Sequence, residues 1–168
     1  MQSKLPPRIR RAYYDCRYGQ LHLHNAIPAG GGFDELTPLI CLHGADQTGR
    51  VFLPLLTPLG YQRSVYALDA PGAGESDPAP GVAAVEAAAH AAMDFVEANR
   101  IRRFDLLARE QGCDAALRVL AERGEAVRRV VLLGATGVTQ AANVSLVPLA
   151  DAARPDLAVR LVSLFANP

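Results

Sequence analysis

Residues 103–123 read RFDLLAREQGCDAALRVLAER, and this stretch contains a change of hydrophobic period. Its first part, residues 104–108, is a short apolar run that is typical of a buried strand and too short for a helix of its own. From Cys113 onward the apolar residues follow helical spacing, on a face made by Cys113, Ala116, Leu117, Leu120 and Ala121. The stretch therefore predicts a strand, a sharp turn and a helix.

The turn between strand and helix reads Ala108-Arg109-Glu110-Gln111-Gly112. It matches the pattern G-x-S-x-G, in which a tight strand-to-helix turn exposes a serine nucleophile, except at its first glycine and at the serine itself. Glu110 occupies the position of that serine. The turn is therefore interpreted as a nucleophile elbow that has lost its nucleophile.

Three other segments follow predicted strands: His43-Gly44, DAPGAGES at residues 69–76, and VVLLGA at residues 130–135. Together with the elbow, and in this order, they resemble the α/β-hydrolase fold family over residues 11–137. The glycines of DAPGAGES are not interpreted as a phosphate loop, because the segment lacks the G-K-[ST] ending that would bind a nucleotide and its metal.

The resemblance implies an α/β fold with a truncated, mostly parallel sheet of about six strands, an antiparallel hairpin at its start and helices on both faces. One domain is expected over residues 1–168, with its core at 11–137 and a helical tail at 138–168. The hairpin is predicted at residues 11–18 and 21–26, joined by Gly19-Gln20. Because the full family fold has more strands, the chain is expected to correspond to its amino-terminal portion.

The last predicted strand, residues 127–133, has the apolar character of a strand inside a parallel sheet. The tail after it is predicted to contain one helix, which starts near Pro155-Asp156, and no further strand. An unpaired outer edge would then remain on residues 127–133, which predicts a homodimer or a protein partner at this edge. The alternative is a tail that folds over the edge and a monomeric protein.

Serine hydrolases of this class need a nucleophile, a histidine base, an orienting carboxylate and amides that bind the oxyanion. The resemblance assigns the oxyanion amides to the backbone of Ala45 and Gln111. It places these further residues in the pocket: His43, Gly44, Arg109 and Gly112. No histidine follows His90 in the sequence, although the family's histidine comes after the elbow.

Two functional hypotheses follow from Glu110. In the first, its carboxylate accepts hydrogen bonds from the Ala45 and Gln111 amides, pairs with Arg109 and plugs the site, so the protein is a non-catalytic binding or assembly module with a possible small-molecule ligand. In the second, the protein is a hydrolase of small esters, with Glu110 as nucleophile or with the missing acid and histidine supplied by a partner chain. A fragment of a longer hydrolase-like protein is a third possibility.

Composition excludes several other classes of function. Basic and acidic residues balance at 17 each, which argues against a nucleic-acid partner. The amino terminus lacks the apolar segment of a signal peptide, and no stretch approaches the roughly 18 apolar residues of a membrane span, so a cytoplasmic protein without membrane contact is expected.

Metals and cofactors are not predicted from the sequence. The three cysteines lack metal-ligand spacing. His90 lies between Glu86 and Asp94 on the polar face of a helix predicted at residues 82–99, where such residues are usually ordinary surface. His22 and His24 are assigned only to the opening hairpin.

Overall fold

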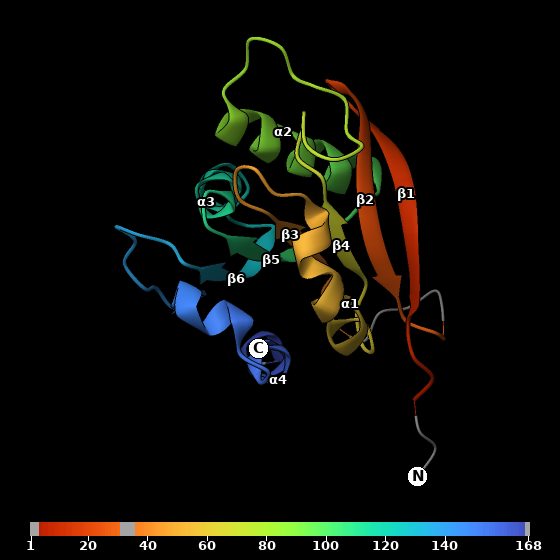
Figure 1. The fold of residues 1–168 in the computed structure, drawn as a ribbon, viewed down its shortest axis with the longest axis vertical. Helices are drawn as coiled ribbons and strands as arrows, with labels where there is room; N and C mark the ends of the chain where they lie inside the picture. Colours follow the sequence, from red (N-terminus) through yellow and green to blue (C-terminus); the bar gives the residue numbers. More distant parts are fainter. Residues whose placement is uncertain (1–3, 31–35, 167–168) are drawn as a thin grey trace.

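The computed structural model describes residues 4–30 and 36–166. Their strands form one sheet in the order β1-β2-β4-β3-β5-β6-β7 (Figure 1). β1 and β2 pair antiparallel, β2 also pairs antiparallel with β4, and all other neighbours are parallel. The strands are β1 (Arg8–Cys16), β2 (Gly19–Ile27), β3 (Leu39–Leu42), β4 (Val65–Leu68), β5 (Phe104–Arg109), β6 (Val127–Leu133) and β7 (Val144–Val147).

Helices cover both faces of this sheet, so the predicted mostly parallel α/β architecture is confirmed. Helices α2 and α3 pack on one face, and α1 and α4 pack on the other (Figure 1). The α-helices are α1 (Leu53–Leu59), α2 (Ala84–Ala98), α3 (Gly112–Glu122) and α4 (Leu157–Ala166), with short 3₁₀ helices η1 (Gly49–Phe52) and η2 (Leu149–Ala153). In the part of the chain that the structure describes, no helix is both long and apolar enough to cross a lipid bilayer.

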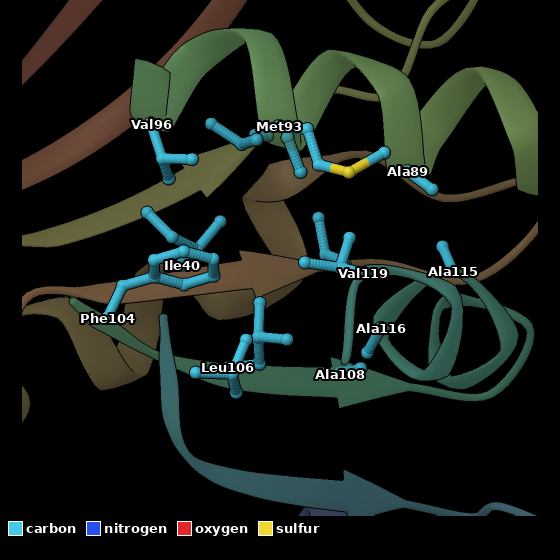
Figure 2. Close-up of a cluster of buried hydrophobic side chains, with 14 of the residues drawn as sticks. Ile40, Ala89, Met93, Val96, Phe104, Leu106, Ala108, Ala115, Ala116 and Val119 are labelled. Carbon is cyan, nitrogen blue, oxygen red and sulfur yellow. The ribbon is translucent and has the colours of Figure 1, made fainter. Parts of the chain in front are cut away.

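The central strands are buried on both sides, which explains their continuous apolar sequences. Along β3, Ile40 and Leu42 face the layer of α2 and α3, whereas Leu39 and Cys41 face α1 and α4. Figure 2 shows the first of these two cores, where side chains of α2 and α3 meet those of β3 and β5. Alternate residues of each strand thus contribute to separate cores.

The first hairpin differs from the prediction in its turn. The strands are joined by Arg17-Tyr18, and Gly19 already pairs with Cys16 inside the ladder. Contacts with α2 hold the turn, because the Arg17 backbone amide and guanidinium donate to Asp94 at 2.9 and 2.8 Å. Tertiary packing therefore selected a register that the local turn residues did not indicate.

The predicted unpaired edge on residues 127–133 is wrong. β7 pairs in parallel with β6 from Val130↔Val144 to Leu133↔Val147, so the sheet has seven strands and β6 lies inside it. The tail covers the edge, as the monomeric alternative requires, but it does so by adding a strand. Backbone groups of β6 need hydrogen-bond partners, and the four residues of β7 provide them along the second half of that strand. No strand beyond β7 occurs in the described residues.

A buried ionic cluster fixes helix α4 against the sheet. Asp105 is fully buried at the start of β5, and it accepts from Arg63 at 2.7 Å and from Arg128 at 2.6 Å. Both guanidinium groups also donate to the carbonyl oxygen of Phe165, in the last turn of α4. These cations satisfy carbonyl groups at a helix end that would otherwise lack partners.

Candidate functional site

Glu110 stands at the corner between β5 and α3 with a left-handed backbone, at φ 53°. Non-glycine residues adopt this conformation rarely. Its amide donates to the Leu133 carbonyl at 2.9 Å, and its carbonyl accepts from Cys113 at 3.0 Å, so both neighbouring strand and helix hold the turn. Gly112 is required by close packing, because a Cβ there would collide with the Leu42 carbonyl oxygen. The elbow geometry is thus present without its serine.

The Glu110 carboxylate is bound by side chains. Its Oε2 accepts from Gln47 Nε2 at 2.7 Å and from Arg109 Nε at 3.0 Å. The expected bond from the Ala45 amide is wrong, because that amide donates to Gln111 Oε1 at 3.1 Å. The Gln111 side chain binds the Ala45 amide, while the Glu110 carboxylate is held by the side chains of Gln47 and Arg109.

Two glutamines therefore complete the site, and the sequence analysis identified neither side chain. Gln47 accepts from the Gly44 amide at 3.0 Å through Oε1 while its Nε2 binds Glu110. Gln111 was assigned only through its backbone. No local sequence signal marks either residue, because both act across the loop after β3 and the elbow, which only the fold brings together.

His43 is buried beside the elbow and has backbone partners on both ring nitrogens. Nδ1 lies 2.8 Å from the Gly44 carbonyl oxygen, and Nε2 accepts from the Ala70 amide at 2.9 Å. A carbonyl can only accept, so Nδ1 carries the proton and Nε2 keeps its lone pair for Ala70. A ring held in this way has no free nitrogen with which to take a proton.

A cavity of about 300 Å³ opens beside these residues. The predicted pocket residues His43, Gly44, Ala45, Gln111 and Gly112 line it, together with the loop at residues 70–73 and the start of α2. Arg109 instead lines a separate cavity of about 350 Å³, which lies between α1 and the tail. The elbow thus separates two cavities, and the predicted set of pocket residues is divided between them.

The other histidines lie away from the elbow. His90 was predicted as an ordinary surface residue, and this is wrong. The Tyr18 hydroxyl lies 2.7 Å from its Nδ1, and its side chain is only 17% exposed. His22 and His24 are buried on β2 and meet Asp69, the first residue of DAPGAGES. Burial and the neighbouring His22 lower the pKa of His24. No spacing pattern in the sequence joins these three residues.

Cys113, directly after the elbow, is no substitute nucleophile. Burial raises the pKa of its thiol to about 12, and Sγ faces the Leu133 carbonyl oxygen at 3.6 Å. A thiol with such a pKa stays protonated at neutral pH, and the protonated form is a poor nucleophile.

Comparison with known proteins identifies the family. The model of the alpha/beta hydrolase fold matches residues 37–161. The chain belongs to the α/β-hydrolase fold family. A comparison with curated protein sequences finds no match.

Solved structures of α/β-hydrolase fold proteins superpose on most of this chain. Naproxen esterase from Bacillus subtilis is 22% identical, with a TM-score of 0.66 over 77% of this chain and 44% of that one. An epoxide hydrolase from an endophytic Streptomyces is 19% identical, with a TM-score of 0.62 over 74% and 37%. A bacterial membrane phospholipase A is 25% identical, with a TM-score of 0.66 over 79% and 42%. The chain spans less than half of each of these proteins, and the likeness is one of fold.

Proposed function

We propose that this α/β-hydrolase fold chain is a non-catalytic binding module with a blocked nucleophile elbow. The observation that carries the proposal is the hydrogen bonding of Glu110, whose carboxylate is held by Gln47 and Arg109. With the Ala45 amide occupied by Gln111, an oxyanion has no free amide at that position. The elbow then serves to shape the cavity.

The positions of the four histidines support this proposal. Both ring nitrogens of His43 bind backbone groups, and His90 on α2 bonds with the hydroxyl of Tyr18 in the β1–β2 turn. The remaining pair lies on β2 with Asp69. An ester formed on Glu110 would need a water molecule activated by a general base, and none of these rings is arranged for that step.

The ligand best suited to the cavity is a small, uncharged and partly apolar molecule. The volume of about 300 Å³ is at the lower end of ligand cavities. Ala84, Val85, Ala88 and Ala115 supply apolar walls. Gln111 and Gln47 supply amide groups at one end, where they can exchange their present bonds for bonds with a ligand.

Hydrolysis of a small ester is the alternative function. The left-handed backbone of Glu110 favours it, since the turn keeps the form that presents a nucleophile. The structural relatives named above are esterases and other hydrolases. In this alternative, Glu110 attacks the ester or a partner chain supplies the missing acid and histidine.

Assembly with a second copy or another protein also remains part of the proposal, with β7 as the outer edge in place of β6. β7 has only four residues, and the described chain adds no strand beyond it. Light scattering at micromolar concentration tests this part. A dimer mass supports pairing of two copies at the edge, and a monomer mass at all concentrations contradicts that self-association.

Hydrolysis of p-nitrophenyl acetate tests the main proposal. The wild type and Glu110→Gln should both give the buffer rate. Glu122→Gln, an exposed glutamate on α3 that pairs with Arg118, is the matched control. Turnover that is lost in Glu110→Gln and kept in Glu122→Gln would establish the ester hydrolase and overturn the non-catalytic proposal.

A further inference from the structure

A second polar cluster lies away from the elbow, at the end of β4. His22 and His24 are two residues apart on β2, so their side chains share one face of the sheet. Asp69 follows β4, which pairs antiparallel with β2 next to them, at Leu23↔Leu68. The three side chains are 2%, 8% and 2% exposed, and their potential ligand atoms lie within 4.8 Å of one another. We call these residues the Asp69 cluster.

Hydrogen bonds fix the tautomer of His22. Asp69 Oδ1 accepts from the Gly49 amide at 2.7 Å, and Oδ2 accepts from the Glu75 amide at 3.1 Å. His22 Nδ1 lies 2.8 Å from the same Oδ2. A carboxylate that already binds two amides acts as an acceptor, so Nδ1 of His22 donates. The lone pair of the neutral ring is then on Nε2.

Two buried nitrogens in this cluster have no hydrogen-bond partner among the residues that the structure describes. Within residues 4–30 and 36–166, neither His22 Nε2 nor His24 Nδ1 meets a hydrogen-bond donor or acceptor. The two rings meet edge to face, with centroids 5.1 Å apart. Buried polar atoms are nearly always satisfied in folded proteins, and two such exceptions side by side call for an explanation.

We propose that His22, His24 and Asp69 form a binding site for a divalent transition-metal ion of the zinc class. The two histidines supply nitrogen donors, which are the atoms left without partners. The Asp69 carboxylate, on the same face, supplies negative charge and orients His22. Histidine ligands that donate their second nitrogen to a carboxylate are typical of zinc sites. With these two protein donors, water molecules would complete the coordination of the ion, one ligand fewer from the protein than in open zinc sites, which have three.

The charges around the cluster determine which ions suit it. Arg11 and Arg50 place positive charge near His24, and this opposes binding that rests on charge alone. Magnesium and calcium depend on several oxygen ligands, which the cluster lacks. Zinc, nickel and copper form strong bonds with imidazole nitrogen. We therefore expect Zn²⁺ to bind and Mg²⁺ not to bind.

An ion can reach the cluster past Tyr13. This residue is opposite His22 in the β1–β2 ladder, and its ring centroid lies 5.0 Å from that of His22. The Tyr13 side chain is half-exposed, and its hydroxyl makes only a long contact of 3.5 Å with Glu75. Rotation of this ring would open the His22 side of the cluster without moving a strand.

Calorimetric titration of the untagged, chelator-treated chain with Zn²⁺ tests the proposal. The wild type should bind close to one equivalent and show a higher melting temperature with Zn²⁺. His24→Gln should weaken binding by more than the 10- to 100-fold that is typical for loss of an outer partner. His90→Gln, which removes a histidine outside the cluster, should bind as the wild type does.

A readout on the wild type keeps the test independent of variant folding. In nitrogen-15 spectra of the imidazole rings, Zn²⁺ should shift the signals of His22 and His24 and leave those of His43 and His90 in place. The proposal is overturned if the wild type binds no Zn²⁺. It is equally overturned if binding is lost in His90→Gln but kept in His24→Gln, or if the shifted signals belong to His43 or His90.

Discussion

Two buried polar clusters lie at opposite ends of the parallel strands, and they differ in how completely their groups are paired. The Asp105 cluster, formed by Arg63, Asp105 and Arg128 at the start of β5, is closed by several short bonds and by the Phe165 carbonyl. The Asp69 cluster at the end of β4 contains two nitrogens that have no hydrogen-bond partner in the described part of the chain.

This difference separates a structural role from a binding role. In the Asp105 cluster, each charge that leaves water gains an opposite charge and further hydrogen bonds, so nothing remains for a ligand to satisfy. In the Asp69 cluster the carboxylate is satisfied, but both imidazoles keep capacity that the protein itself does not use. A ligand is indicated by unsatisfied hydrogen-bonding capacity, and polarity or burial alone does not indicate one.

The largest effect is expected from Asp105→Asn. The change removes the only negative charge of the Asp105 cluster and leaves two guanidinium groups in a buried setting, so the free energy of unfolding should fall by about 3–5 kcal/mol. Urea unfolding at neutral pH measures it. Asp156→Asn, which breaks an exposed pair with Arg154, is the control and should leave the free energy of unfolding nearly unchanged, because solvent screens that pair. Equal losses of unfolding free energy in the two variants would mean that the Asp105 cluster stabilises the fold no more than an exposed ion pair does.

Gly49→Ala should have an intermediate effect on the Asp69 cluster. A Cβ at this position would lie 2.6 Å from the Ala67 carbonyl oxygen and 3.1 Å from Asp69 Oδ1, so the amide that binds Asp69 must move. We expect a loss of about 1–3 kcal/mol in the free energy of unfolding, and weaker Zn²⁺ binding if the carboxylate shifts.

Gly30→Ala is the matched control for this change, because a Cβ there meets nothing within 4 Å. It should leave the free energy of unfolding unchanged or raise it by about 0.4–1 kcal/mol, because alanine lowers the conformational entropy of the unfolded chain. A Gly49→Ala variant as stable as Gly30→Ala would mean that the Gly49 amide does not hold Asp69 in place.

A smaller loss of unfolding free energy is expected from Asp94→Asn. The partly exposed pair of Asp94 with Arg17 can then be compared with the two buried clusters. Burial raises the pKa of Asp94, but the hydrogen bonds and charge of Arg17 outweigh it, so the pKa lies below the ordinary value of 3.8. The ionised form is therefore favoured by folding. At pH 7 the variant should lose roughly 0.5–1 kcal/mol of unfolding free energy.

The pH dependence of this loss follows from the direction of the shift. The stabilisation by Asp94 is complete above the unfolded-state pKa and disappears as the pH falls through the lower folded-state pKa. The difference between the wild type and Asp94→Asn, followed by urea unfolding from pH 7 downward, should shrink only below about pH 4. A difference that grows on acidification has the opposite sign and contradicts the assignment.

The smallest effect concerns the coupling of the two clusters. They share no hydrogen-bond partner, so the stability losses of His24→Gln and Asp105→Asn should add within about 0.5 kcal/mol in the double variant. The rise in melting temperature with Zn²⁺ should likewise be the same in Asp105→Asn as in the wild type. A larger coupling energy would show that the clusters act as one network through the sheet.

The sequence determined the architecture wherever hydrophobic period carried the information. The change of period at residues 103–123 predicted β5, the corner at Glu110 and α3, and the strand predicted before His43-Gly44 is β3. Gly112 ends the elbow pattern in the sequence, and in the structure a side chain at this position would collide with the Leu42 carbonyl oxygen. These features are local, because each depends on residues that are neighbours in the chain.

Tertiary structure alone decided which residues meet in the candidate sites. Val144–Val147 became a strand because β6 had backbone groups to pair, although its four residues are too few for a clear strand pattern. Gln47 met Glu110, and His22 met Asp69, across 63 and 47 positions of sequence. Periodicity indicates which face of an element is buried, but only the order of strands in the sheet decides which polar side chains meet at its ends.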